Sequence, residues 1–214
     1  PASRRSQRLF PLLDFRSMPE PVFWCQAALQ DDRIVAAGAG VVFCCDLAGR
    51  LAWARRQTWV PPPGRGMYDA RWWLVQKASP PIIQDRWVYA TQPGVWSIEC
   101  IDLGTGRRRW QTSLSELVGM VGLFRGKLIA LTIEGLVALD AESGRVLWRH
   151  DTPGRQEGLL YGPPGGLAYA KRKPPADPNR EQPKILLVWL DLDQGVPVGV
   201  YPEELSAETK RLGG

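Results

Sequence analysis

Short apolar runs alternate with glycine, aspartate and proline along most of the chain. The clearest runs lie at 126–131 and 135–140, and the second is followed by Ser143 and Gly144, which favour a turn. Apolar runs of this length, bounded by turn residues, are typical of short antiparallel β-strands. The 22 glycines and 19 prolines among 214 residues favour many turns and disfavour long helices. The pattern therefore predicts an all-β protein.

One arrangement of these runs recurs along the chain. It consists of an opening turn, a strand, a second strand that ends in aspartate, a glycine turn, and a strand with a tryptophan. The aspartates are Asp46, Asp102, Asp140 and Asp191, the glycines are Gly49, Gly106, Gly144 and Gly195, and the tryptophans are Trp53, Trp110 and Trp148. The fourth copy has no tryptophan after its glycine.

The spacing inside each copy favours a turn built from the aspartate and the glycine. The glycine stands four positions after the aspartate in three copies and three positions after it in the first. The aspartate can accept hydrogen bonds from its own turn, and the glycine can adopt a positive φ. A further apolar stretch precedes each opening turn, at 22–28, 81–84, 118–123 and 159–161. The chain is therefore predicted to form a β-propeller-like array of about four four-stranded antiparallel blades.

The segments 138–148 and 100–110 resemble the repeat of the pyrroloquinoline-quinone-like (PQQ-like) β-propellers. That pattern runs alanine, leucine, aspartate, two variable residues, threonine or serine, glycine, three variable residues and tryptophan, and the resemblance covers residues 21–201. The family includes bacterial outer-membrane assembly propeller lipoproteins and is WD40-like and YVTN-like in architecture. Its complete members resemble wheels of seven or eight blades, so four copies imply a partial or open propeller.

The repeat pattern divides the chain. We expect a connector at 1–20, PQQ-like repeats over 21–201 and a C-terminal tail at 202–214. The expected blades are 21–58, 80–114, 116–152 and 158–201, and the expected insertions are 59–79 and 172–184.

The basic character of the chain is local. The net charge is +5, and residues 50–77 contain six lysines and arginines against one aspartate. Within the first insertion, Trp59, Arg65, Trp72 and Trp73 are the candidate partner-binding residues. Aromatic and basic side chains interleaved in this way can stack on bases or sugars. The alternative is a loop whose tryptophans pack as a small core over one propeller face.

No catalytic, cofactor-binding or metal-binding constellation is predicted. His150 is the only histidine, which excludes a multi-histidine metal site, and its place at the end of a strand predicts a solvated or capping role. Cys44 and Cys45 fall on the aspartate-ending strand, where buried cysteine acts as a small hydrophobe. Quinone-dependent alcohol dehydrogenases of the superfamily have a disulfide between neighbouring cysteines, so the resemblance leaves that alternative open.

The sequence and the resemblance together predict a non-catalytic protein-interaction scaffold, without a cofactor, as part of a larger bacterial protein. The expected partner is a protein rather than nucleic acid. Two alternatives stay open: a fragment of a quinone-dependent dehydrogenase, and a propeller that binds glycan or nucleic acid through 59–79. No run approaches the roughly 18 apolar residues of a membrane span. The resemblance implies an extracytoplasmic location, in the periplasm or cell envelope.

Overall fold

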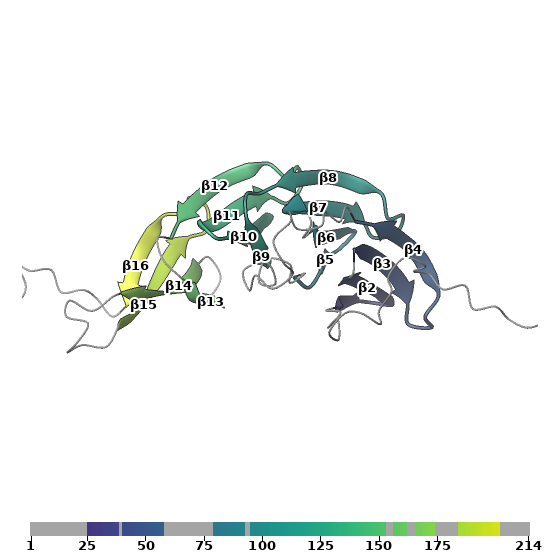
Figure 1. Ribbon diagram of the computed structural model, residues 1–214, viewed down its shortest axis with the longest axis horizontal. Helices are drawn as coiled ribbons and strands as arrows, with labels where there is room; N and C mark the ends of the chain where they lie inside the picture. The colour runs from purple at the N-terminus through teal and green to yellow at the C-terminus, as the bar shows by residue number, and fades with distance from the viewer. Residues whose placement is uncertain are drawn as a thin grey trace, which may run out of the picture.

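The protein forms an open arc of four β-sheets (Figure 1). The computed structural model describes residues 25–38, 40–57, 79–92, 95–152, 156–161, 166–173 and 184–201. These ranges contain 16 strands, and every sheet has four antiparallel strands in an up-and-down order. The predicted all-β, propeller-like fold is confirmed. The expected connector and tail lie outside the described residues.

The strands follow the chain from one end of the arc to the other. The first sheet has β1 (Gln26–Gln30), β2 (Arg33–Gly38), β3 (Val41–Asp46) and β4 (Leu51–Arg56), and the second has β5 (Ile82–Gln84), β6 (Trp87–Gln92), β7 (Ser97–Asp102) and β8 (Arg108–Ser113). The third sheet has β9 (Leu117–Phe124), β10 (Lys127–Thr132), β11 (Gly135–Asp140) and β12 (Val146–Asp151), and the fourth has β13 (Gln156–Tyr161), β14 (Gly166–Lys173), β15 (Lys184–Asp191) and β16 (Pro197–Tyr201).

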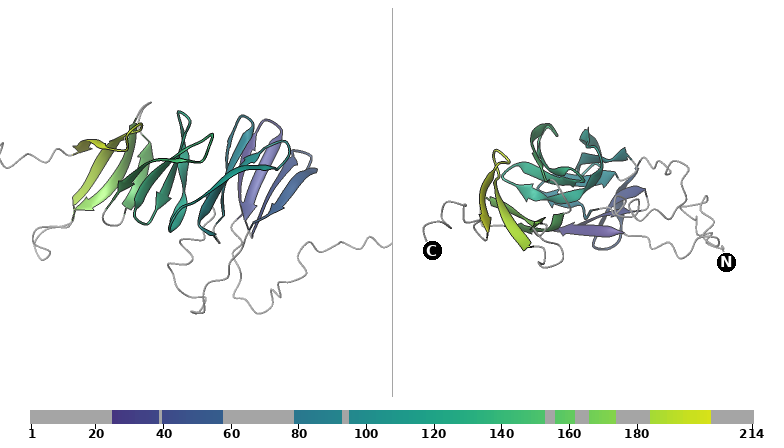
Figure 2. Two further views of the ribbon diagram at one scale, coloured as in Figure 1. Left: turned by 90° about the horizontal axis from the view of Figure 1, so that it is seen from above. Right: turned by 60° about the vertical axis from the view of Figure 1, so that its left-hand side comes forward.

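Neighbouring sheets stack face to face along the arc (Figure 2). The fourth strands β4, β8, β12 and β16 lie along the convex side, and the first and fourth sheets stand at its two ends without meeting (Figure 1). Successive sheets are therefore blades of an open propeller. We call the contact between one blade and the next a junction.

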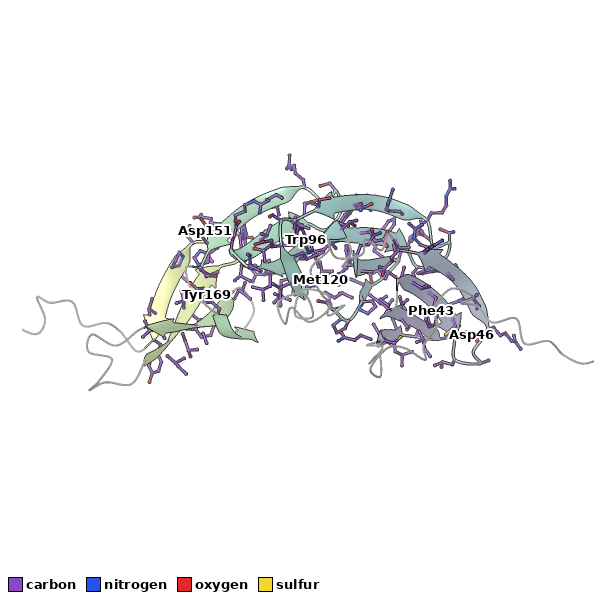
Figure 3. All side chains as sticks on the ribbon, in the orientation of Figure 1. Phe43, Asp46, Trp96, Met120, Asp151 and Tyr169 are labelled. Atoms are coloured by element: carbon purple, nitrogen blue, oxygen red, sulfur yellow. The ribbon has the colours of Figure 1, made fainter. Side chains whose placement is uncertain are left out.

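Each junction contains its own hydrophobic core. Between the first two blades, Val42, Cys44 and Trp53 pack with Val88 and Ile101. The second and third blades, and the third and fourth, are joined by equivalent clusters. Side chains fill these spaces along the whole arc (Figure 3).

The position of a blade decides whether buried and partly exposed residues alternate along its strands. Strands β7 and β11 have neighbouring blades on both faces, and all their residues except Asp140 are buried. Strand β3 belongs to the end blade, so Val42 and Cys44 are fully buried while Phe43 and Cys45 on the opposite face are only half-buried. Continuous burial therefore marks strands that are covered on both sides, and alternating burial marks a strand that is covered on one side.

The cysteine pair follows this pattern. All the cysteines are free thiols, so Cys44 and Cys45 are not bonded to each other. Cys44 is a core residue, as predicted, and burial raises the pKa of its thiol. The expectation of a core role does not hold for Cys45, which is half-buried on the face of the first blade that no other described blade covers.

Candidate functional site

Every repeat aspartate organises its own turn. In the third blade, Asp140 Oδ1 accepts hydrogen bonds from the backbone N–H of Ser143 at 2.7 Å and from its hydroxyl at 2.6 Å. These bonds hold the pKa of the Asp140 carboxyl below its ordinary value. Thr105 makes the same two contacts with Asp102, and the Arg86 guanidinium contributes most to lowering the pKa of that carboxyl. The turn role predicted for the aspartate is confirmed.

The repeat glycines adopt the left-handed backbone conformation. Their φ angles are 77° at Gly49, 70° at Gly106, 73° at Gly144 and 70° at Gly195. This is the region that glycine enters without steric cost. The predicted positive φ is confirmed in all four turns.

The repeat tryptophans reach across the junctions to the turns of the next blade. Trp53 Nε1 donates to the Leu103 carbonyl at 2.7 Å. Trp110 Nε1 donates to the Ala141 carbonyl at 3.1 Å, and Trp148 Nε1 to the Leu192 carbonyl at 2.9 Å. Each acceptor directly follows the turn aspartate. We call this arrangement the Trp–turn contact.

The glycine of the turn lies directly beneath the indole ring. A Cβ atom on Gly106 would lie 2.8 Å from ring atoms of Trp53. On Gly144 it would lie 2.6 Å from the ring of Trp110, and on Gly195 2.5 Å from the ring of Trp148. Because real Cβ atoms do not approach this closely, the contact requires glycine for space as well as for φ.

A second polar group reinforces each junction, two residues after the tryptophan. Arg55 Nη1 donates to the Gly106 carbonyl at 2.9 Å, and the Thr112 hydroxyl to the Gly144 carbonyl at 2.6 Å. His150 Nε2 lies 3.0 Å from the hydroxyl of Tyr169 on the fourth blade. His150 is half-buried at a junction, so the expectation of a solvated or capping histidine was wrong.

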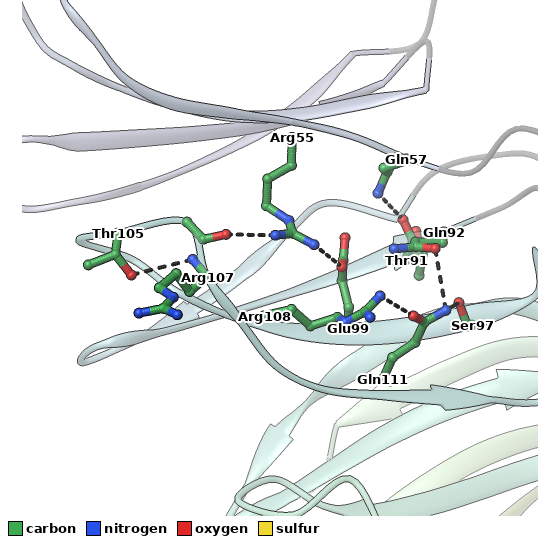
Figure 4. A network of polar contacts seen from close by, with 11 residues as sticks. Arg55, Gln57, Thr91, Gln92, Ser97, Glu99, Thr105, Arg107, Arg108 and Gln111 are labelled. Atoms are coloured by element: carbon green, nitrogen blue, oxygen red, sulfur yellow. Dashed lines mark hydrogen bonds and ion pairs between the residues drawn. The ribbon is translucent and has the colours of Figure 1, made fainter.

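The first junction also contains a charged pair (Figure 4). Arg55 Nη2 lies 3.3 Å from Glu99 Oε2, and the Glu99 side chain is 1% exposed. Register places Phe43 and Val137 at the corresponding positions of the first and third blades, so a carboxylate replaces an apolar residue. The other carboxylate oxygen, Oε1, and Arg55 Nε are buried without a hydrogen-bond partner.

One end of the blades bears exposed apolar side chains on fixed turns. Trp96 and Ile133 lie in the turns between the second and third strands of their blades and are 44% and 55% exposed. The Trp96 carbonyl accepts the Leu114 N–H at 2.8 Å, and the Ile133 N–H donates to the Glu116 carbonyl at 3.2 Å. We call the blade ends that carry these turns and the blade-to-blade connections the loop face.

The predicted partner-binding residues Trp59, Arg65, Trp72 and Trp73 lie outside the described residues. The chain segments that hold the two insertions join the fold at the loop face. Residues 58–78 connect β4 to β5. Residues 174–183 connect β14 to β15, whose last paired residues at this end are Lys173 and Lys184. Trp96 and Ile133 were not predicted as surface residues, because short hairpin turns differ little in sequence from the runs that flank them.

The described part of the chain has neither a cluster of metal ligands nor a membrane-spanning helix. No three histidine, cysteine, aspartate or glutamate side chains lie together as ligands of a metal ion would. No helix there is long and apolar enough to cross a membrane.

The stacked blades define a β-propeller repeat protein. The profile of a PQQ-like family, described as outer membrane protein assembly factor BamB, matches residues 96–164. The resemblance to PQQ-like propellers that the repeat predicts is confirmed by this match and by the structural comparison below. No curated protein matches the chain.

Solved propellers share the fold at low sequence identity. The BamB structure from Moraxella catarrhalis is 19% identical with a TM-score of 0.58, and the match covers 82% of this chain and 47% of that one. The Pan2 WD40 domain of Neurospora crassa is 12% identical with a TM-score of 0.53, covering 82% and 50%. Hsv2 of Kluyveromyces lactis is 10% identical with a TM-score of 0.52, covering 78% and 47%. The chain thus spans about half the length of these structures.

Proposed function

We propose that the protein is a non-catalytic propeller module that binds another protein through its loop face, as part of a larger bacterial protein. The observation that carries this proposal is the pair of exposed apolar side chains, Trp96 and Ile133, on turns anchored by backbone hydrogen bonds. Exposed tryptophan on a rigid backbone is typical of the residues that dominate protein interfaces.

The distribution of polar groups supports the same function. The repeat aspartates bind their own turns, and Arg55, Thr112 and His150 bind across junctions. The first set shapes each turn and the second holds neighbouring blades together, which leaves the loops to supply a binding surface. Function on a propeller resides in such surfaces rather than in the fold.

The relatives agree with a scaffold role. The matching family is described as an outer membrane protein assembly factor, and the first matching structure is a BamB protein. By this similarity we extend the proposal to an assembly partner of protein class in the cell envelope. The insertion with Trp59, Arg65, Trp72 and Trp73 joins the loop face, and we include it in the proposed binding surface.

Photocrosslinking in the host cell tests this proposal. A photoreactive amino acid replaces Trp96 or Ile133 of the full chain, and Val198 serves as the control because it is 66% exposed on β16, away from the loop face. We expect a discrete crosslinked protein from positions 96 and 133 and none from 198. The same bands from all three positions, or none from any, would contradict the proposal.

The two alternatives have separate readouts. Addition of pyrroloquinoline quinone and calcium should give dye reduction if the chain forms part of a dehydrogenase, and we expect none. Glycan or oligonucleotide binding that depends on Trp72 and Trp73 would favour the other alternative. We expect Trp72→Ala and Trp73→Ala to leave glycan and oligonucleotide binding unchanged.

A further inference from the structure

The first blade has an apolar face that no other described blade covers. Register places Leu29, Ile34, Cys45 and Leu51 in one row across its four strands. Residues directly opposite on neighbouring strands project from the same side of a sheet. Val35, Val42 and Cys44 occupy the opposite side and pack against the second blade. The row therefore belongs to the outer face of the first blade, and this blade stands at one end of the arc (Figure 1).

The same row is a core element in the next two blades. In the second blade it contains Val88 and Ile101, and in the third it contains Leu128 and Leu139. All four of these residues are fully buried against the preceding blade. In the first blade, by contrast, the equivalent residues Ile34 and Cys45 are only half-buried, and Leu29 and Leu51 beside them are each 63% exposed. This blade therefore has the apolar pattern of a junction on a face with no neighbour among the described residues.

The turn of the first blade shows the same difference. A Cβ atom on Gly49 would meet nothing within 4 Å, whereas in the other three turns it would meet a tryptophan ring. The residue after the turn aspartate, Leu47, is 64% exposed. Its counterparts Ala141 and Leu192 are 7% and 4% exposed. The first turn thus has the glycine and the apolar residue that a Trp–turn contact requires, but no tryptophan of the described residues lies over it.

The three other junctions identify what fits this site. Each turn is covered by a tryptophan from the fourth strand of the preceding blade. The tryptophans pair with small residues, as Trp110 does with Cys100 and Trp148 with Ala138. In the fourth blade this pair is exchanged, because Gly199 occupies the fourth strand and Trp189 the third. The fourth blade of a second copy would therefore present no fourth-strand tryptophan.

We propose that the outer face of the first blade is the docking face for a further propeller blade whose fourth strand carries a tryptophan. Its indole covers Gly49 and donates to the carbonyl of Leu47, while its apolar face covers Leu29 and Leu51. The docking blade is therefore not the fourth blade of a second copy of this chain, the blade that contains residues 184–201. The span of about half the length of the matched propellers is consistent with additional blades. This inference concerns an end of the arc and is independent of the loop face.

Thiol labelling measures whether the face is covered. Leu47→Cys is made in the full chain together with Cys25→Ser and Cys45→Ser, so the new thiol is the exposed one. A second protein carries an added copy of 115–152 ahead of residue 1, which supplies a tryptophan-bearing blade. A third carries the same addition with Trp148→Ala in the added copy only. The added copy of 80–114, with Trp110, provides a second version if the first fails to fold.

We expect the chain without the addition to label rapidly at every protein concentration. The added blade should slow labelling at least tenfold, and its Trp148→Ala version should restore most of the rate. Equal labelling with the intact and the substituted blade would overturn the proposal. Slow labelling of the chain without the addition would also overturn it. If slow labelling of the chain without the addition becomes slower at higher protein concentration, and light scattering reports a dimer, a second copy covers the face. If the labelling rate does not depend on concentration, another part of the same chain covers it.

Discussion

The indole ring of Trp110 covers Gly144 so closely that a Cβ atom on this glycine would lie 2.6 Å from the ring atoms Cδ2 and Cε3. The two residues belong to neighbouring blades, on β8 and in the turn that follows β11. The same relationship joins Trp53 to Gly106 and Trp148 to Gly195. The repeat motif therefore connects blades as well as shaping each one.

Gly144→Ala and Gly49→Ala form a matched pair that isolates this contact. The φ angles are nearly equal, 73° and 77°, but only Gly144 lies under a tryptophan. Gly49→Ala should cost about 1 kcal/mol of unfolding free energy, from backbone strain alone. Gly144→Ala should cost roughly 1–3 kcal/mol more because the ring must move. Urea denaturation measures both, and equal losses would show that the Trp–turn contact adds nothing.

The indole hydrogen bond makes its own contribution. Trp148→Phe keeps most of the ring but leaves the Leu192 carbonyl without its 2.9 Å donor. We expect a loss of about 1–3 kcal/mol, since the carbonyl is left unpaired at a junction. Trp96→Phe is the control, because Trp96 is 44% exposed in a turn. A loss no greater than that of the control would refute the proposed role of the hydrogen bond.

The Arg55–Glu99 pair should behave as a coupled unit. Glu99→Val leaves the Arg55 side chain, which is 27% exposed, without its carboxylate, and Arg55→Thr leaves Glu99 unpaired. Each should cost about 2–4 kcal/mol, by the cost of breaking a buried pair. The double variant reproduces Thr112 and Val137 of the next junction. The double variant should therefore lose less unfolding free energy than the sum of the two single losses. Additive losses in a double-mutant cycle would contradict the coupling.

Acid should weaken the aspartate turns. The Ser143 hydrogen bonds lower the pKa of Asp140 below its ordinary 3.8, so the unfolded chain binds the proton more readily. The stabilisation is complete above that value and is lost as the pH falls through the lower pKa of the folded state. In the Asp140→Asn variant, the unfolding free energy should decrease less steeply below pH 4 than in the unmodified protein. Glu134→Gln, at an exposed position, should leave that decrease unchanged. Parallel curves for all three proteins would argue against this source of acid sensitivity.

The thiols should react in an order set by burial. Burial raises the pKa of the Cys100 thiol to about 12, so very little reactive thiolate forms at pH 8. We expect Cys25, which is exposed, to react first with a thiol reagent, and Cys44 and Cys100 to react only on unfolding. Peptide mapping after brief alkylation measures the order. Early modification of Cys100 would contradict the packed second junction.

Much of the fold could be predicted from the sequence because its signals are local. The aspartate, the glycine and the short apolar runs determine turns and strands within a few residues, so four four-stranded blades followed from their recurrence. The role of His150 was predicted incorrectly for the opposite reason. Its partner Tyr169 lies on another blade, and no local pattern indicates which strand end faces a neighbour.

The sequence by itself determined the class of fold, the number of repeats and the residues of each turn. Only the tertiary structure decided what the repeat tryptophans contact, because those contacts join blades whose relative positions depend on the packing of whole sheet faces. The same packing distinguishes Gly49 from Gly106, Gly144 and Gly195, which look alike in the sequence. An indole ring lies over three of these glycines and is absent from the fourth among the described residues, because a junction requires a blade on each side.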